Sequence, residues 1–400
     1  MDDLIFISAQ PDQHYFHWQV ELYLYQFAKH GIKDKCYAVF AYYGKGPSQY
    51  IQDLAKTYNI RWYKDERPSS GYIPSVRPHV LKKFFKEHPE LGKNVFYHDS
   101  DIFLVKMPPF EEMLKDDVGY LSDTISYIGH DYIVECSKRY KAKHPELPDN
   151  DILQKMCDCI GISVDLVKQN EKNSGGAQYL LKGIDEQYWQ DAETDCYKLF
   201  NMMKAYEKKY PIDHHIQTWT TDMWCVLWEY WKRGKETRIH KELAFSWATD
   251  SRLTYHKRNI FHLAGITESS PKTHFFKGRY KDTNIFDRFR ENPQMFDDIS
   301  EDSITIEYTN VIKELMGVKP SVPEKKVNTI IIDTDDHWSG VYEKDFKTQH
   351  FGKEIWRSTD KKYIMFWNSN VWMLTASQYE SEISKTCGGF KSYSSLDQLY

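Results

Sequence analysis

The chain has 400 residues, more than one hydrophobic core usually supports, so its length predicts one large domain and a smaller module. Its 53 basic and 58 acidic residues give a formal net charge of −5 at pH 7, which argues against a general nucleic-acid-binding protein. Aromatic residues make up 16% of the chain, enough rings to line a sugar-binding cleft as well as to fill a core.

The sequence shows no targeting or membrane signal. The N-terminus lacks the basic start and apolar core of a signal peptide, and no uninterrupted apolar run reaches membrane-spanning length. Seven cysteines, an odd number, without an export signal are typical of reduced thiols in a cytosol-like compartment. Cys157 and Cys159 lie close together, but no second Cys/His pair completes a zinc pattern. We therefore expect a soluble, cytoplasmic protein with no membrane span and no lipid anchor.

The first third of the chain alternates strand-like and helical segments. In order, the pattern predicts a strand at 4–8, a helix at 16–30, a strand at 36–43, a helix at 49–58, a strand at 60–63, a helix from Pro78 to Phe85 and a strand that ends at Asp99. This alternation is typical of a mainly parallel sheet, in which ligands bind beyond the carboxyl ends of the strands. Ser8, Ala9 and Gln10 lie at one such end and Asp99 to Asp101 at another, so we expect one cleft to receive both.

The segment Asn94-Val-Phe-Tyr-His-Asp99-Ser-Asp101-Ile-Phe-Leu is the most informative part of the sequence. An apolar run ends in two carboxylates one residue apart, and the chain turns apolar again straight after. Two such carboxylates can share one hard divalent cation, which neutralises a diphosphate and stabilises it as a leaving group. The alternative is an Asx-type turn whose side chains bond the local backbone. The segment alone does not separate the two interpretations, but the expected cleft favours the metal.

Two later segments combine glycine or tryptophan with polar residues. In Asn173-Ser-Gly-Gly176, Gly175 and Gly176 precede an apolar strand, where they permit close approach of a ligand or form a plain turn. From Trp219 to Trp231 the apolar residues recur at helical spacing, which favours core packing over a carbohydrate platform for Trp219 and Trp224. Asp222, near the start of this helix, is either an N-terminal helix charge or an active-site acid.

A third segment, Ile260-Phe-His262-Leu-Ala-Gly265, predicts a strand that ends in histidine and glycine, and Lys277-Gly278 follows it. A lone histidine at a strand end is usually structural. Together with Lys277, His262 is a candidate third metal ligand beside a cation for phosphates.

In their order along the chain, these motifs resemble those of the metal-dependent, nucleotide-sugar glycosyltransferases of the GT-A fold. The resemblance rests on Ser8 to Gln10, Arg77-Pro78, Asp99-Ser-Asp101, Asn173 to Gly176, Trp219-Thr-Thr-Asp222-Met-Trp, His262 to Gly265 and Lys277-Gly278. Within that group the chain is most similar to plant and algal peptidyl hydroxyproline arabinosyltransferases and serine galactosyltransferases, and to related glycosyltransferases of large algal viruses. The similarity covers roughly residues 3 to 285.

The resemblance implies a fold, ligands and residue roles. It implies a GT-A-like α/β fold with a mainly parallel mixed sheet flanked by helices, a UDP- or GDP-sugar donor with UDP favoured, and Mn²⁺ or Mg²⁺. It places the metal on Asp99, Asp101 and His262. The donor would contact Ser8, Ala9, Gln10, Arg77, Asp99, Lys277 and Gly278. The acceptor and sugar would contact Gly175, Gly176, Trp219 and Trp224.

The implied reaction moves the sugar to a hydroxyl of a glycan or glycoprotein, with Asp222 as the catalytic carboxylate. With inversion of configuration Asp222 would be the general base; with retention, which the nearest relatives favour, the leaving phosphate would take the proton and Asp222 would steady the positively charged sugar. Two departures from the family pattern bear on these roles: Lys277 follows His262 at a longer interval, and Asp222 stands where relatives often have Glu.

The composition changes after about residue 282. Helices are expected at 286–296 and 305–316, and Pro320 and Pro323 punctuate a linker. We expect a glycosyltransferase domain at 1–317, a linker at 318–326 and a small β-rich module at 327–400, with a hairpin turn at Asn368-Ser-Asn370. The module either binds an acceptor or a partner through Trp338, Trp356, Trp367 and Trp372, or only covers the larger domain.

Asp333-Thr-Asp335 in this module imitates the first carboxylate pair, but it lies outside the resemblance and we expect no role for it. Two rival functions remain for the whole chain. One is a non-catalytic carbohydrate-binding protein on a transferase fold, and the other is a metal-dependent phosphohydrolase that uses Asp99 and Asp101.

Overall fold

The computed structural model describes residues 3–68, 71–318, 329–332, 340–350, 353–367, 372–376 and 391–393. The chain divides into two compact units, Met1–Val318 and Lys319–Tyr400. The division falls within the linker expected at 318–326, of which only Val318 lies among the described residues.

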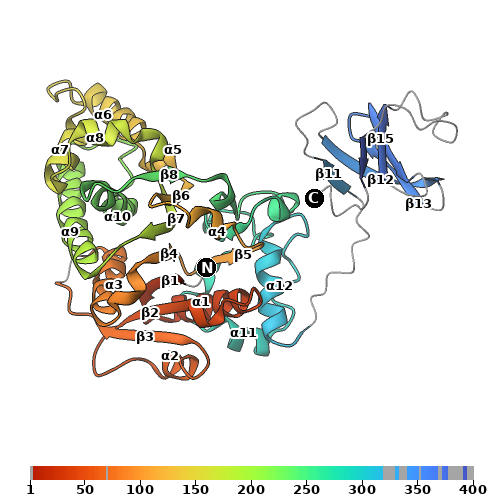
Figure 1. Ribbon diagram of the computed structural model, residues 1–400, viewed down its shortest axis with the longest axis horizontal. Helices are drawn as coiled ribbons and strands as arrows, with labels where there is room; N and C mark the ends of the chain where they lie inside the picture. The colour runs from red at the N-terminus through yellow and green to blue at the C-terminus, as the bar shows by residue number, and fades with distance from the viewer. Residues whose placement is uncertain are drawn as a thin grey trace. The chain divides into compact units, whose positions relative to one another are not determined.

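A seven-stranded sheet forms the centre of the first unit (Figure 1). In order across the sheet, its strands are β3 (Asn59–Lys64), β2 (Cys36–Tyr42), β1 (Leu4–Pro11), β4 (Asn94–His98), β7 (Gly175–Lys182), β6 (Gly119–Asp123) and β8 (Thr237–Ile239). Six of these strands run parallel to one another, and β7 alone runs antiparallel to its neighbours β4 and β6. The amino end of β7 therefore lies at the same edge as the carboxyl ends of β4 and β6.

Strand β1 is buried along its whole length because both faces of the sheet are covered. Its side chains alternate between the faces, as successive residues of a strand must. Ile5 and Ile7 join the core beneath α3, α9 and α10, whereas Leu4 and Phe6 join the core beneath α1 and α12. This explains why the strand reads as a continuous apolar run rather than an alternating one.

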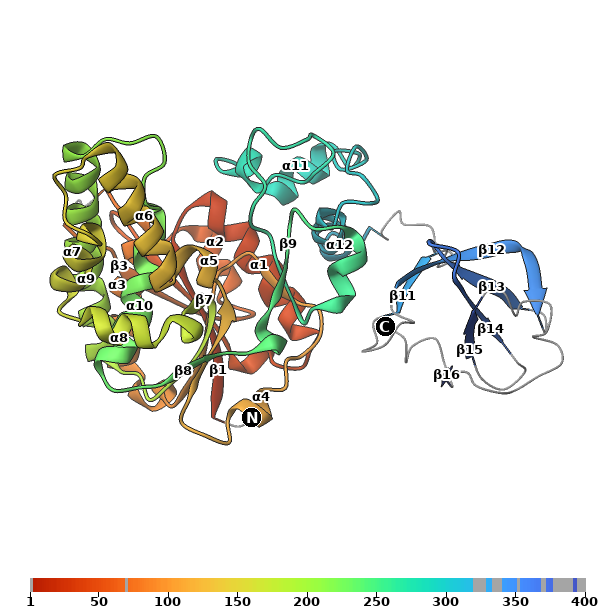
Figure 2. The same ribbon diagram turned by 90° about the horizontal axis from the view of Figure 1, so that it is seen from above.

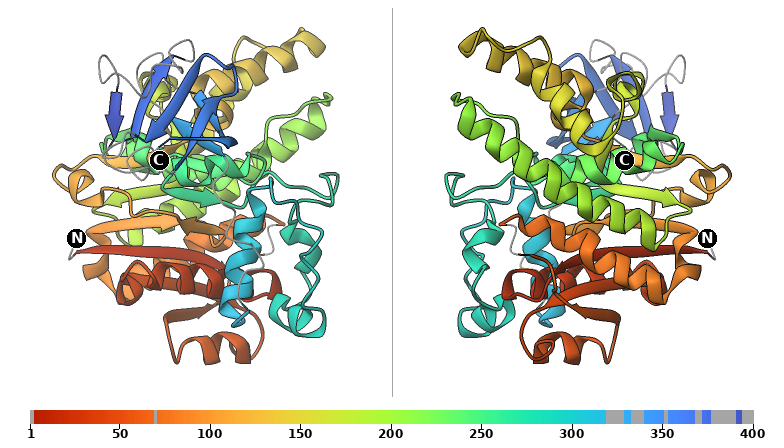
Figure 3. Two further views of the ribbon diagram at one scale, coloured as in Figure 1. Left: turned by 90° about the vertical axis from the view of Figure 1, so that its right-hand side faces the viewer. Right: turned by 90° about the vertical axis from the view of Figure 1, so that its left-hand side faces the viewer.

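Helices cover both faces of the sheet. They are α1 (His14–Ala28), α2 (Gln49–Leu54), α3 (Val76–Glu87), α4 (Phe110–Met113), α5 (Ile125–Ile128), α6 (His130–Lys143), α7 (Asp151–Ile160), α8 (Val164–Gln169), α9 (Glu186–Lys209), α10 (Thr221–Lys232), α11 (Ile285–Glu291) and α12 (Thr305–Leu315). Helices α6 to α9 gather at one end of this unit and α11 and α12 at the other (Figure 2). The long helix α9 runs beside α3 in the right-hand view of Figure 3.

A second, three-stranded sheet lies beside the first and carries β5 (Ile102–Leu104), β10 (Ile260–His262) and β9 (Phe245–Trp247) in that order. Strand β5 follows β4 after a three-residue turn, so this turn joins the two sheets. In the antiparallel pair of β5 and β10, Ile102 lies opposite His262.

The described residues of the second unit form an antiparallel sheet whose strands follow one another in chain order. They are β11 (Thr329–Ile332), β12 (Gly340–His350), β13 (Lys353–Ser358), β14 (Tyr363–Trp367), β15 (Trp372–Ala376) and β16 (Lys391–Tyr393). The expected hairpin partners β14 and β15 pair antiparallel, while its turn lies outside the described residues. So do Asp333, Asp335 and Trp338; the side chain of Trp356 is buried.

The predicted fold class is confirmed: the first unit has the mixed, mainly parallel sheet flanked by helices that the GT-A resemblance implies, and a small β-rich unit follows it. The predicted helix at 286–296 is wrong at its end, because α11 stops at Glu291. Pro293 explains this end, since it offers no backbone N–H and keeps Asn292 out of the helical region. Among the described residues, no helix combines the length and apolar character needed to cross a membrane.

Candidate active site

The turn between β4 and β5 carries Asp99, Ser100 and Asp101 at the carboxyl edge of the large sheet. The reversed strand β7 begins at this edge, and its Gln178 pairs with His98, the last residue of β4. Strand β10 closes the turn from the other side, where the Leu263 backbone N–H donates to the Asp101 carbonyl oxygen at 3.0 Å. The two sheets thus bring three chain segments that are remote in sequence to one place.

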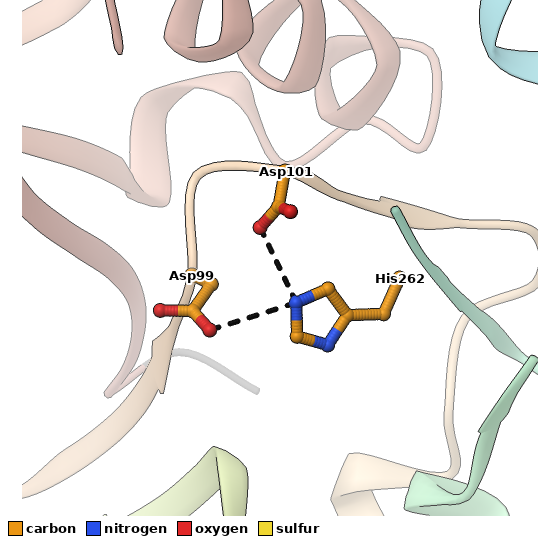
Figure 4. A group of neighbouring side chains, drawn as sticks. All are labelled: Asp99, Asp101 and His262. Carbon is orange, nitrogen blue, oxygen red and sulfur yellow. Dashed lines mark ion pairs between the residues drawn. The ribbon is translucent and has the colours of Figure 1, made fainter. Parts of the chain in front are cut away.

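Asp99, Asp101 and His262 form one group whose nitrogen and oxygen atoms lie within 4.8 Å of one another (Figure 4). His262 Nε2 lies 3.6 Å from Asp99 Oδ2 and 3.3 Å from Asp101 Oδ1. The other oxygen of each carboxylate contacts a cationic side chain: Asp99 Oδ1 pairs with Arg77 at 2.8 Å, and Asp101 Oδ2 pairs with Lys277. One oxygen from each aspartate and one imidazole nitrogen therefore converge on the same point.

The charges around this group act on its ionisable side chains. Burial would raise the pKa of Asp101, but the Lys277 charge outweighs it and holds that pKa below its ordinary value. Burial would lower the pKa of Lys277, but the Asp101 carboxylate outweighs it and raises that pKa. Burial also lowers the pKa of His98 to about 4, so the histidine before the turn is neutral. The site thus holds an ionised Asp101 and a charged Lys277 near neutral pH.

A pocket of about 460 Å³, its open mouth included, lies next to this group. Arg77 connects the two, because its guanidinium bonds Asp99 on one side and Asp222 Oδ2, at 2.9 Å, on the other. Tyr72 donates its hydroxyl proton to Asp222 Oδ1 at 2.8 Å and accepts a bond from the Asp222 backbone N–H. Asp222 thus lies in the first turn of α10 with both carboxylate oxygens directed into a polar network.

The glycines predicted to approach a ligand lie within β7 and not in a loop. Gly175 and Gly176 are buried, and a Cβ at Gly175 would meet the Ser122 carbonyl oxygen at 2.3 Å. The need for glycine at Gly175 thus comes from strand packing against β6. The next residue, Ala177, lines the pocket and has a φ of 66°, in the left-handed region that alanine rarely adopts.

The two tryptophans predicted to contact a sugar differ in position. Trp219 lines the pocket and is 66% exposed, so its ring is accessible to a ligand. For Trp224 the contact implied by the resemblance is wrong and the core packing predicted from helical spacing is confirmed: its ring is fully buried, and its indole N–H donates to the Ile128 carbonyl oxygen at 2.8 Å. Helical spacing places Trp224 on the inner face of α10 with Trp228, and both belong to the core.

The prediction for Ser8, Ala9 and Gln10 is also wrong as far as their side chains are concerned. All three are at most 5% exposed, because β1 continues to Pro11 with β2 paired alongside. The Ser8 hydroxyl bonds the Tyr23 hydroxyl at 2.7 Å, and the Gln10 amide donates to the Val39 carbonyl oxygen at 3.1 Å. The carboxyl end of β1 at which a ligand could bind lies a few residues later in the chain.

Lys277 and Gly278 begin a short 3-10 helix, Lys277–Tyr280. Lys277 reaches Asp101, whereas Gly278 leaves room for the ring of Phe276, which a Cβ at this position would meet at 2.3 Å. Lys277 thus lies beside the carboxylates, its contact with a donor diphosphate stays a prediction, and Gly278 has a packing reason.

Several residues of the site were given no role from the sequence, among them Tyr72, Ala177, Gln178 and Tyr179. Gln178 was the one with a signal, because a glutamine inside the apolar strand Ala177-Gln-Tyr-Leu-Leu must find buried hydrogen-bond partners. Tyr179 lines the pocket, is 3% exposed, and its hydroxyl has no hydrogen-bond partner among the described residues.

A second group with metal-binding residue types, His130, Asp131 and Glu171, has a structural explanation. Glu171 accepts a hydrogen bond from the backbone N–H of His130 at 2.5 Å, which caps the start of α6. Asp131 is largely exposed and bonds His130 at 2.8 Å.

Three solved glycosyltransferase structures are similar to this chain at low scores. The galactosyltransferase LgtC in complex with donor and acceptor sugar analogues has a TM-score of 0.34 and 12% identity, covering 72% of this chain and 99% of its own. The apo form of mouse xyloside xylosyltransferase 1 has a TM-score of 0.31 and 8% identity, covering 67% and 99%. An active-site mutant of LgtC has a TM-score of 0.31 and 14% identity, covering 69% and 93%.

No family model matches the chain, and no curated protein matches it. The architecture of this chain therefore rests on its own strand order, and the description of its site rests on its own side chains.

Proposed function

We propose that this chain is a metal-dependent glycosyltransferase that moves a sugar from a UDP- or GDP-linked donor to a hydroxyl of a glycan or glycoprotein. One observation carries the proposal: two carboxylate oxygens and an imidazole nitrogen converge beside a lysine, at the mouth of a pocket that holds Asp222. The motif order that resembles GT-A glycosyltransferases supports the same reaction class.

The residues present suit a divalent cation such as Mn²⁺ or Mg²⁺. Asp99 Oδ2, Asp101 Oδ1 and His262 Nε2 would hold it, and a set of two carboxylates and one imidazole suits Mn²⁺ in particular. The remaining oxygens of both aspartates are already bonded to Arg77 and Lys277, which fixes the direction in which the free oxygens point. When bound, the cation would neutralise the donor diphosphate and stabilise it as a leaving group.

Lys277 would supply the second positive charge for the diphosphate. Its ammonium group contacts Asp101 and so lies beside the oxygens that would hold the cation. Its raised pKa keeps it charged throughout the physiological range, and a fixed charge placed where negative charge develops lowers the barrier for departure of the nucleotide.

The pocket would receive the transferred sugar and the acceptor hydroxyl. Arg77 and Tyr72 hold the Asp222 carboxylate in place, and the exposed ring of Trp219 offers an apolar surface for a sugar face at the mouth. Protonation of Asp222 would break its ion pair with Arg77. We therefore favour retention of configuration, with Asp222 steadying positive charge on the sugar rather than accepting the acceptor's proton.

A panel of UDP- and GDP-sugars, each with and without Mn²⁺, tests the proposal. We expect one donor to raise the melting temperature only when Mn²⁺ is present, and to lose its sugar to added saccharide acceptors or, slowly, to water. Asp101→Asn should abolish both effects, whereas Asp335→Asn, in the second carboxylate pair of the chain, should change neither. Donor binding without sugar release, or phosphate release from simple phosphoesters without transfer, would overturn the proposal in favour of one of its rivals.

A further inference from the structure

A buried chain of hydrogen-bonding groups leads away from the far side of His262. Gln178 Nε2 lies 3.2 Å from His262 Nδ1, and Gln178 Oε1 lies 2.7 Å from the Ser122 hydroxyl oxygen. The same hydroxyl oxygen lies 2.7 Å from the carbonyl oxygen of Leu243. Ser122 and Gln178 are fully buried and His262 is 6% exposed, so these groups bond one another rather than water.

The direction of these hydrogen bonds follows from the Leu243 carbonyl, the last group in the series. A backbone carbonyl only accepts, so the single hydroxyl proton of Ser122 goes to Leu243, and no proton is left for Gln178 Oε1. The two ends of a side-chain amide have nearly the same size, and hydrogen bonding decides which is which. With the amide reversed, its NH₂ group donates to Ser122 and its oxygen accepts a proton from His262 Nδ1. Each of these contacts then joins one donor to one acceptor.

We infer that Ser122 and Gln178 are positioning residues that hold His262 as the tautomer protonated on Nδ1. The lone pair of Nε2 then points toward Asp99 Oδ2 and Asp101 Oδ1, as a metal ligand must. The inference rests on the proposed function, because it gives His262 the metal-binding role expected there. It adds two residues that touch neither metal nor substrate. It also gives all the hydrogen bonds one direction of donation, from His262 toward the Leu243 carbonyl, which can only accept.

Packing against two neighbouring aromatic rings restricts the orientation of the His262 ring. The Phe245 ring centroid lies 5.1 Å from that of His262, and the Trp247 ring lies parallel to it within 10° at 6.4 Å. The backbone of His262 is held in β10, opposite Ile102. The orientation of the imidazole is therefore set by β9 and β10, while its tautomer is set by β6 and β7, which carry Ser122 and Gln178.

Binding of Mn²⁺ alone to the full chain, followed by electron paramagnetic resonance, tests the inference. Gln178→Met keeps the length of the side chain but cannot accept the Nδ1 proton, and it should weaken Mn²⁺ binding roughly 10- to 100-fold. At saturating Mn²⁺ it should also lose the ¹⁴N coupling of a bound imidazole. Gln178→Glu accepts the same proton through a carboxylate, so it should retain both wild-type affinity and the coupling. Ser122→Ala should give a smaller loss in the same direction.

The outcomes separate the inference from the function on which it rests. Unchanged Mn²⁺ affinity and ¹⁴N coupling in Gln178→Met, or an equal loss in Gln178→Glu, would overturn the role of Gln178 while leaving the metal site intact. A wild-type spectrum without ¹⁴N coupling would remove His262 as a ligand, and the inference with it, whereas sugar transfer remains measurable in the donor panel. Circular dichroism confirms that each variant is folded, and Ser122→Ala decides the matter should Gln178→Met fail to fold.

Discussion

Glu229 and Asp195 place two carboxyl groups beside one lysine in the core of the first unit, and replacing Glu229 by glutamine should change how stability depends on pH. The two acidic side chains are 2% and 4% exposed. The ammonium group of Lys232 contacts Glu229, lies 3.3 Å from Asp195 Oδ2 and donates to the Ile160 carbonyl oxygen at 2.9 Å. Burial and the contact with Asp195 raise the pKa of Glu229 to about 7, against the opposing charge of Lys232.

The sign and size of the effect follow from this pKa. Below pH 4.5 Glu229 is protonated in both the folded and the unfolded chain, so its contribution to stability is fully present. As the pH rises toward 7, the unfolded chain releases the proton while the folded chain retains it, and the free energy of unfolding falls. At about 1.36 kcal/mol for each step of one in pKa, the rise from 4.5 to about 7 amounts to roughly 3 kcal/mol.

Urea unfolding of the wild type and of Glu229→Gln between pH 4.5 and 8 measures this contribution. Glutamine still donates to Asp195 and accepts from Lys232 but does not ionise, so the variant should gain roughly 3 kcal/mol relative to the wild type across this range. Glu236→Gln, at a side chain that is 75% exposed, serves as the matched control and should follow the wild type. Parallel pH profiles for the wild type and Glu229→Gln would refute the reasoning.

Three further substitutions test the site. Asp101→Asn should abolish Mn²⁺-dependent transfer, a loss of roughly 100-fold or more, because it removes an oxygen proposed to hold a metal that would stabilise the leaving group; initial rates measure this loss, and turnover at the wild-type rate would exclude the metal-centred mechanism. Trp219→Ala should raise KM for the sugar substrates and leave the melting temperature unchanged, since the ring is 66% exposed; a lowered melting temperature would instead assign the ring to the core. Ala177→Gly should raise the free energy of unfolding by about 1 kcal/mol, because glycine removes the strain of a left-handed alanine. Ala205→Gly, on the exposed face of α9, is the control and should lower the free energy of unfolding by about 1 kcal/mol. A change of the same sign in both variants would contradict the strain at Ala177.

The local pattern predicted much of the first unit because its central strands are short apolar runs between amphipathic helices. Strands β1 to β4 and the helices between them lie where periodicity placed them, with ends that shift by a few residues. The reversal of β7 and the small sheet of β5, β9 and β10 were not predicted, because strand direction and partner choice depend on contacts between remote segments. Apolar periodicity carries no information about those contacts.

The candidate site shows the same difference between what local patterns predict and what contacts between remote segments decide. Asp99, Asp101, His262 and Lys277 come together as expected, although 176 residues separate Lys277 from Asp101. Helical spacing favoured core packing for both tryptophans, which is right for Trp224 and wrong for Trp219, while burial of Trp224 excludes the ligand contact that the resemblance implied for it. The bridging role of Arg77 between Asp99 and Asp222 was invisible in the sequence, since nothing local indicates which two acids a long side chain will join.

The pairing of β5 with β10 has a consequence for how the protein is made. The aspartates emerge from the ribosome long before the strand that carries His262, so a nascent chain that ends before β10 holds only two of the three converging ligand atoms. The pairing of β5 with β10 closes this long loop, which costs chain entropy, so we expect the two strands to pair late in folding. Uptake of the proposed ion would then report that β10 has paired with β5, and its binding would add to the stability of the folded first unit.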